Sequence, residues 1–134
     1  MSTAIPITAA LYAAVLGLMA VALTVRVIMG RVKTGIQSGD GGNAPLAQAI
    51  RAHANFAEQV PLALLLIVLV EATGSPAILV HTLGAVLVLA RLANAWGLSR
   101  SLGPTMPRQS GAGLTGLVVT AASVLILYRA FAGH

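Results

Sequence analysis

Residues 60–70 read VPLALLLIVLV, an apolar run without a charged side chain. With the residues before it, from Pro45, and after it, to Thr73, it is long enough for a helix across a bilayer core of about 30 Å. Working outward, residues 5–25 contain no charge either, and two more apolar segments follow. We expect an all-α integral membrane protein of one domain, residues 1–134, an up-down-up-down four-helix bundle with spans at about 5–29, 45–73, 76–98 and 109–131.

Composition supports this class. Charged residues make up 8% of the 134 residues, whereas soluble domains have about 25%. The high apolar content also excludes a disordered chain. The chain has no cysteine, which excludes disulfides, a cysteine nucleophile and cysteine-ligated metals.

Local signals place the breaks between the helices. Pro61 removes the usual hydrogen-bond donor for the carbonyl of Ala57, which predicts a kink. Gly74 suits the left-handed position after a helix, Ser75 an N-cap and Pro76 the first helical position. So short a joint predicts that the second and third helices form an antiparallel hairpin.

The distribution of basic residues predicts the orientation, because they favour the cytoplasmic side. One side of the predicted bundle holds five, and the opposite side holds only Arg129. We therefore expect both long loops in the cytoplasm, both termini outside, and a location in a bacterial inner membrane. The five are Arg26, Arg31, Lys33, Arg100 and Arg108.

Three polar residues share one face of the second span. Arg51, Asn55 and Glu58 are spaced i, i+4, i+7. Arg51 and Glu58 are two turns apart, roughly 10 Å along the axis, so we expect no direct pairing, and each needs another helix, a ligand or water. Polar side chains also hold membrane helices together. We favour a ligand site, and the two charge signs suit a zwitterion.

Further arginines are predicted at the same end of the bundle. Arg91 and Asn94 lie one turn apart on the third span, Arg26 and Arg31 end the first, and Arg108 begins the fourth. Anchoring at the cytoplasmic interface explains part of this cluster. Guanidinium groups also bind carboxylates through paired hydrogen bonds, which predicts a ligand that carries a carboxylate.

The other polar residues give weaker signals. His53 and His81 are isolated, and we expect Glu71 to be only solvated. The three histidines have no metal-ligand spacing, so no metal is expected. The glycine-rich segment 39–42 lacks the lysine of a phosphate loop, and no nucleic-acid partner is expected. Glycines 111, 113 and 116 suggest close helix packing, for which a contact between protomers is one place.

The motif from Arg51 to Pro61, R-x-x-x-N-x-x-E-x-x-P, resembles the signature of the MAPEG family, the membrane-associated proteins of eicosanoid and glutathione metabolism. The segments Gly39-Asp40-Gly41-Gly42-Asn43 and Ala90-Arg91-Leu92 are also similar to bacterial members. The resemblance implies a homotrimer with glutathione sites between protomers, open to the cytoplasm.

The resemblance also implies roles for single residues. Arg51 suits a carboxylate of glutathione and Glu58 its ammonium group, with Asn55 between them. An arginine that ends the first helix, Arg26 or Arg31, contributes as well, and Arg108 matches the arginine that stabilises the thiolate. We take Arg108 and Arg31 as candidate catalytic residues. The candidate substrate-binding residues are Arg51, Asn55, Glu58, Arg26, Arg91 and Asn94.

Three positions depart from the family pattern. Gln59 stands where many catalytic relatives have tyrosine, and Asn94 and Leu98 stand where eicosanoid enzymes have ligand-contacting tyrosines. The function predicted is a glutathione-dependent transferase or peroxidase that acts on lipophilic electrophiles dissolved in the lipid bilayer. The alternatives are a non-catalytic member that binds a lipid or a partner, and a small four-helix exporter, which commonly has a carboxylate in its first span, where this chain has none.

Overall fold

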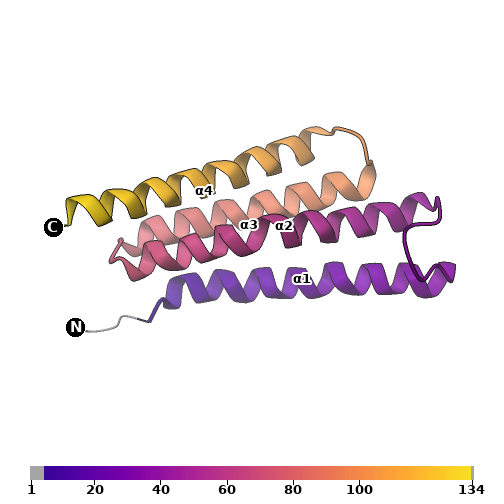
Figure 1. Cartoon of the computed structure of the whole chain (residues 1–134), viewed down its shortest axis with the longest axis horizontal. Helices are drawn as coiled ribbons and strands as arrows, with labels where there is room; N and C mark the ends of the chain where they lie inside the picture. Colours follow the sequence, from indigo (N-terminus) through magenta and orange to yellow (C-terminus); the bar gives the residue numbers. More distant parts are fainter. Residues whose placement is uncertain (1–4, 134) are drawn as a thin grey trace.

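The computed structural model describes residues 5–133, which form four antiparallel helices (Figure 1). They are α1 (Ile7–Thr34), α2 (Ala44–Ala72), α3 (Ala77–Arg100) and α4 (Met106–Ala132). Each is long and apolar enough to cross a membrane. The all-α, up-down-up-down bundle expected from the sequence is confirmed. Helix α1 continues five residues beyond the expected boundary, until Gly35 ends it in a left-handed conformation, φ 73°.

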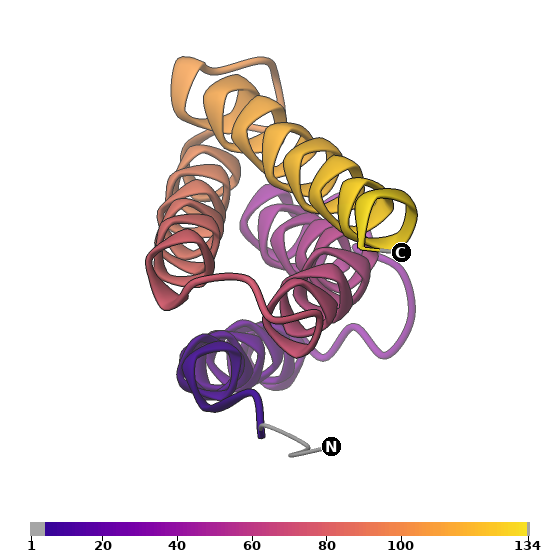
Figure 2. The same cartoon turned by 90° about the vertical axis from the view of Figure 1, so that its left-hand side faces the viewer.

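Helices α2 and α3 form the centre of the bundle. Helix α1 contacts both of them, α4 contacts both of them, and α1 and α4 do not contact each other. The view along the bundle shows this arrangement, with α1 and α4 on opposite sides (Figure 2). The core consists of small and branched side chains such as Leu16, Ala63, Ile67, Leu87 and Ala122. Many of the outward side chains are also large and apolar, as lipid contact requires.

The start of α2 is capped by residues at the end of the α1–α2 loop. Asn43 precedes α2, and its side-chain oxygen accepts a hydrogen bond of 2.9 Å from the backbone N–H of Leu46. Pro45 lies in the first turn, where a missing N–H costs nothing. Helix α2 then continues without interruption through Pro61.

The joint between α2 and α3 differs from the prediction in one respect. Gly74 is left-handed as expected, with φ 80°. Helix α3, however, begins at Ala77 with Pro76 as its N-cap, so neither Ser75 nor Pro76 has its predicted role. The backbone N–H of Ser75 bonds to the carbonyl of Val70 at 3.3 Å, closing the end of α2. Ser75 is buried, and its hydroxyl has no hydrogen-bond partner in residues 5–133.

Glu71, expected to be only solvated, caps the neighbouring helix instead. Its two carboxylate oxygens accept hydrogen bonds from the backbone N–H groups of Thr8, at 3.0 Å, and Ala9, at 2.6 Å. Helix α1 starts after Pro6, which has no side-chain acceptor. A carboxylate at this position satisfies the free N–H groups and interacts favourably with the helix dipole. The end of α2 is thereby fastened to the start of α1.

A second polar contact lies one turn deeper on the same side. The hydroxyl of Tyr12 on α1 lies 2.9 Å from Nδ1 of His81 on α3. The Tyr12 ring covers Gly84, where any side chain would collide with it. His81, isolated in the sequence, therefore has a partner on another helix.

Candidate functional site between helices α2, α3 and α4

Arg51 and Glu58 project from the outer face of α2. Nη1 of Arg51 lies 4.0 Å from Oε1 of Glu58, and the side chains are 49% and 58% exposed. The expectation that they could not pair was wrong, because two long, flexible side chains can bend toward each other over a rise of about 10 Å. A pair at this distance in solvent contributes about 0–1 kcal/mol. Both groups keep most of their capacity to bind a ligand.

Asn55 lies between them on the same helix face. Unlike Arg51 and Glu58, it is held by a residue of another helix in the same protomer. Its Oδ1 accepts a hydrogen bond of 2.9 Å from Nη1 of Arg91. Arg91 is 2% exposed, and its Nη2 donates to the carbonyl of Gly111 at 3.2 Å. One guanidinium therefore joins α2, α3 and α4. Its Nε has no hydrogen-bond partner in the described part of the chain.

A cleft of about 400 Å³ opens beside this network. Asn55 of α2, Asn94 of α3 and Arg108 of α4 all line it. Pro104, Gln109 and Ala112 complete the lining. The structure thus brings three of the predicted site residues, from three helices, to one place, with the volume of an ordinary ligand pocket of about 300–1,000 Å³.

Arg108 is positioned by its own loop. Its Nη1 donates to the carbonyls of Leu102, at 2.6 Å, and Gly103, at 3.2 Å. Its backbone carbonyl accepts a hydrogen bond of 3.1 Å from Nδ2 of Asn94. Within residues 5–133, its Nη2 and Nε make no hydrogen bond. These nitrogens are the donors that Arg108 can offer to a ligand.

Two glycines allow α4 to approach α3 closely enough to form the cleft. A Cβ on Gly111 would lie 2.5 Å from the backbone carbonyl oxygen of Ala90, and one on Gly97 would lie 2.8 Å from the backbone nitrogen of Arg108. The close helix packing expected at Gly111 is present, and it lies inside one protomer, against α3. A Cβ on Gly113 or Gly116 meets nothing within 4 Å.

The arginines of α1 belong to another part of the molecule. Nη1 of Arg26 donates to the hydroxyl of Ser99 on α3 at 2.5 Å. Arg26 lines a cleft that Ala49 of α2 also lines. Ala49 and Arg51 are two residues apart, about 200° around the helix, so Arg26 and Arg51 lie on opposite sides of α2. They share an end of the bundle but no common site within one protomer.

Arg31, the other α1 candidate, fastens the loop that follows it. Its Nη1 donates to the carbonyls of Ile36, at 3.2 Å, and Gly39, at 2.9 Å. The structure therefore places Arg31 beside residues 36–39, in contact with the α1–α2 loop.

Sequence reasoning missed Gln109 and Ser99. Gln109 lines the cleft one residue after Arg108, and Ser99 receives the Arg26 hydrogen bond. Gln109 could have been found from its position directly after Arg108, as a polar residue at the predicted start of the fourth span. Nothing in the local sequence identifies Ser99, because its role depends on how α3 lies against α1. In residues 5–133, no three His, Asp or Glu side chains lie together as metal ligands would.

Comparison with known proteins gives one family. The model of the MAPEG family matches residues 9–128. Two curated relatives, both named inner membrane protein YecN, come from Escherichia coli strain K12 and from Escherichia coli O6:H1 strain CFT073. Each is 34% identical over 93 residues, which are 69% of this chain and 71% of the relative. No solved structure matches the chain with statistical significance.

Proposed function

The chain belongs to the MAPEG family, and from this premise we propose that it is a glutathione-dependent transferase or peroxidase of the bacterial inner membrane. One observation carries the proposal. An exposed pair of opposite charges, Arg51 and Glu58, flanks Asn55, and Asn55 lines the same cleft as Asn94 and Arg108. This arrangement offers a zwitterionic peptide both charge signs at its ends and a cation nearby for its thiol.

The roles follow from the chemistry of each side chain. The Arg51 guanidinium binds a glutathione carboxylate, and the Glu58 carboxylate binds the ammonium group. Their mutual contact at 4.0 Å opens at little cost, because an exposed pair is weak. Asn55 is held by Arg91, so its amide nitrogen is left to donate to the peptide. Arg91 thus acts as a positioning residue for this site.

The thiol becomes reactive by losing its proton to water. A free thiol has a pKa of about 8.5, and only the thiolate attacks well. Lowering that pKa by about 2 units requires about 2.7 kcal/mol of preferential thiolate stabilisation. The unused Nη2 and Nε of Arg108 can provide it in a partly dry cleft. The thiolate then forms a C–S bond with the electrophile, whose leaving group departs with the bonding electrons.

A homotrimer supplies what one protomer lacks. Arg26 lies on the opposite side of α2 from Arg51 and bonds to Ser99, and Arg31 lies beside the α1–α2 loop. Of the two, we take Arg31 as the α1 arginine that a neighbouring protomer brings to this site. The face of α2 that carries Arg51 continues to Leu62 and Leu65, each 54% exposed. These leucines, with the apolar walls of α2 and α4, also suit a lipophilic second substrate. The trimer is tested by light scattering in detergent and by crosslinking Leu62→Cys, a unique thiol in a chain without cysteine.

Because the chain has no cysteine, single introduced cysteines can also test the orientation in the membrane. Both long loops face the cytoplasm and both termini face outward in this proposal, because five basic residues lie at the loop end. Cysteine introduced at Ser38 in the α1–α2 loop is then protected from a membrane-impermeant maleimide added to intact cells. Cysteine at Gly133 reacts under the same conditions. The reverse labelling pattern contradicts the orientation.

Glutathione titration of the purified protein tests the function itself. Arg51→Ala and Glu58→Gln each weaken binding by about tenfold, the cost of one charge-assisted contact. The control Arg129→Gln, which removes a charge at the opposite end of the bundle, leaves the affinity unchanged. Arg108→Gln retains glutathione but loses the ultraviolet absorbance of the bound thiolate and the conjugation of an aryl halide. Equal affinity in the Arg51 and Glu58 variants contradicts the assignment.

A non-catalytic member of the family is the second candidate. It is favoured by the hydrogen bonds that Arg108 and Arg31 make to their own loops, which already hold one nitrogen of each guanidinium. This candidate predicts ligand binding without thiolate absorbance or conjugation. The exporter alternative has less support, because Glu58 is paired with Arg51 and α1 contains no acidic residue.

A further inference from the structure

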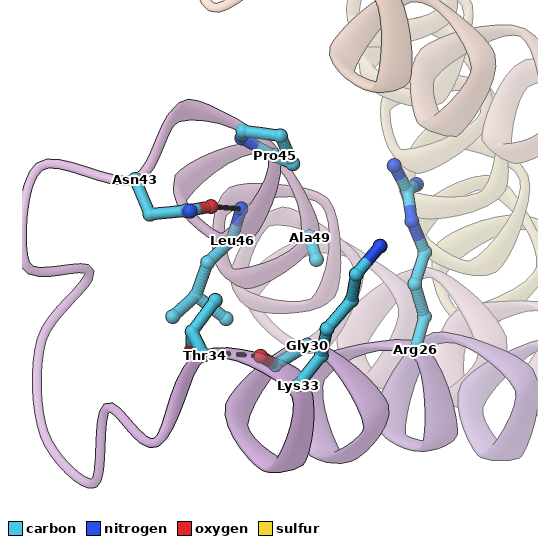
Figure 3. Close-up of a pocket in the computed structure, with 8 residues that line it drawn as sticks. All are labelled: Arg26, Gly30, Lys33, Thr34, Asn43, Pro45, Leu46 and Ala49. Carbon is cyan, nitrogen blue, oxygen red and sulfur yellow. Dashed lines mark hydrogen bonds between the residues drawn. The ribbon is translucent and has the colours of Figure 1, made fainter.

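A second cleft opens at the same end of the bundle but on the other side of α2. It has a volume of about 250 Å³ and lies between the end of α1 and the start of α2. Figure 3 shows the side chain of Lys33 extending from α1 into the gap toward α2, and the side chain of Arg26 rising from α1 beside it. Leu46 and Ala49, both buried, form its apolar floor. This cleft is separate from the site that holds Asn55 and Arg108.

The charges in this cleft are not balanced. Arg26 and Lys33 are both cationic, and no acidic residue is among the residues that line it. Asp40, in the adjacent loop, accepts a hydrogen bond of 2.9 Å from the backbone N–H of Gly42 instead. Arg26 has only the neutral hydroxyl of Ser99 as a partner, and Lys33 forms no salt bridge within residues 5–133. Arg26 and Lys33 lie two turns apart on α1, about 10 Å along its axis, so an anion between them is attracted by both.

The start of α2 strengthens this electrostatic preference without itself being a binding site. Its backbone N–H at Leu46 is already capped by Asn43. The positive end of the helix dipole still points toward the cleft, which favours a negative charge there. The side-chain hydroxyl of Thr34 donates to the carbonyl of Gly30 and so adds no donor to the cleft.

The cationic cleft continues into an apolar hollow on the outside of α1. That hollow measures about 410 Å³, and Gly30 and Lys33 line both spaces. Its other walls are Met29 and Val32, which are 66% and 80% exposed. A Cβ at Gly30 would lie 3.0 Å from Cδ1 of Leu46, so the glycine lets α1 and α2 lie close together at this point. A cationic site joined to an exposed apolar wall matches an amphiphile with an anionic head.

We propose that this α1–α2 cleft binds the phosphate of an anionic phospholipid, held between the Arg26 guanidinium and the Lys33 ammonium group. One acyl chain lies against Met29 and Val32. The shared chemistry is a phosphate oxyanion, which free inorganic phosphate also supplies. The apolar hollow favours the lipid, because free phosphate leaves that surface uncovered.

The test titrates the full-length, detergent-purified protein with phosphatidylglycerol and follows bound lipid by native mass spectrometry. Phosphatidylglycerol binds, while phosphatidylcholine with the same acyl chains binds far more weakly. Each basic residue near a lipid surface contributes about a factor of five to binding. Lys33→Gln therefore weakens phosphatidylglycerol binding about fivefold, and the double variant Arg26→Gln, Lys33→Gln weakens it about 25-fold. The matched control Arg100→Gln removes a charge at the same end, where Arg100 lies over the Trp96 ring, and stays within twofold.

Three outcomes overturn the proposal: equal binding of both lipids, an equal loss in Arg100→Gln and in the double variant, or inorganic phosphate that displaces phosphatidylglycerol at equal concentration. The single variant Lys33→Gln keeps the test decisive if the double variant folds poorly, since Lys33 makes no salt bridge in the described chain. Glutathione affinity separates this inference from the proposed function. Lys33→Gln keeps its glutathione affinity, whereas Arg51→Ala loses glutathione and keeps phosphatidylglycerol.

Discussion

Two arginines at the same end of the bundle, Arg51 and Arg91, contrast in their surroundings. Arg51 stands on the outside of α2, half exposed, with one distant carboxylate for a partner. Arg91 is buried, and its hydrogen bonds go to Asn55 on α2 and Gly111 on α4. The same side chain therefore binds helices together where it is enclosed and remains available to a ligand where it is not. Burial, rather than charge, separates the two roles.

The largest expected effect on stability comes from truncating the buried Arg91 side chain. Arg91→Ala removes the donor to the half-buried Asn55 oxygen and one donor to the buried Gly111 carbonyl, which the Thr115 hydroxyl still bonds at 2.9 Å. It also creates a cavity among α2, α3 and α4. We expect a loss of about 2–4 kcal/mol in the free energy of unfolding, measured by denaturant titration in detergent. The control Arg100→Ala removes an exposed guanidinium and costs little. Equal losses in both variants would contradict a structural role for Arg91.

The next largest effect on stability is expected at the contact between α4 and α3 beside Arg91. Gly111→Ala places a Cβ against the Ala90 carbonyl and pushes α4 away from α3, at a cost of about 1–3 kcal/mol. Gly113→Ala, two residues later on the same helix, meets open space and gains up to about 1 kcal/mol from helix propensity. Thermal unfolding of the two variants should therefore shift in opposite directions. Shifts of the same sign would show that α4 does not pack through Gly111.

A smaller effect on stability is expected at the opposite end of the bundle. There both carboxylate oxygens of Glu71 accept hydrogen bonds from the backbone of α1. Glu71→Ala removes the acceptor for the N–H groups of Thr8 and Ala9, and loss of such a cap costs about 1 kcal/mol. Hydrogen exchange of the first turn of α1 should accelerate more than exchange in the middle of that helix. Unchanged protection of residues 8–10 is the contrary result.

The smallest effect on stability is expected at Arg51. Arg51→Ala breaks only an exposed pair, so the free energy of unfolding changes by less than about 0.5 kcal/mol. Its glutathione affinity falls, whereas Arg91→Ala loses stability. A large destabilisation by Arg51→Ala would remove the contrast between the two arginines and place Arg51 among the structural residues.

Much of the fold follows from local patterns in the sequence. The uncharged segments are as long as a bilayer is thick, and Gly74 turns the chain where predicted. The shared face of Arg51, Asn55 and Glu58 also follows from helix periodicity. The contact between Arg51 and Glu58 did not follow from periodicity. The distance along the helix axis does not account for how far two flexible side chains can reach. Ser75 and Glu71 were misjudged for another reason, since their surroundings depend on how helices end and on which neighbour lies beside them.

The sequence by itself determined that four apolar helices alternate in direction with their basic ends together, because hydrophobic length and charge bias act locally along the chain. Only the tertiary structure decided which arginines are enclosed and which are free, and that α2 separates Arg26 from Arg51. Helix rotation and packing fix these relations. Contacts such as Gly111 against Ala90 and the Arg91 bonds to two other helices join residues that no local pattern connects.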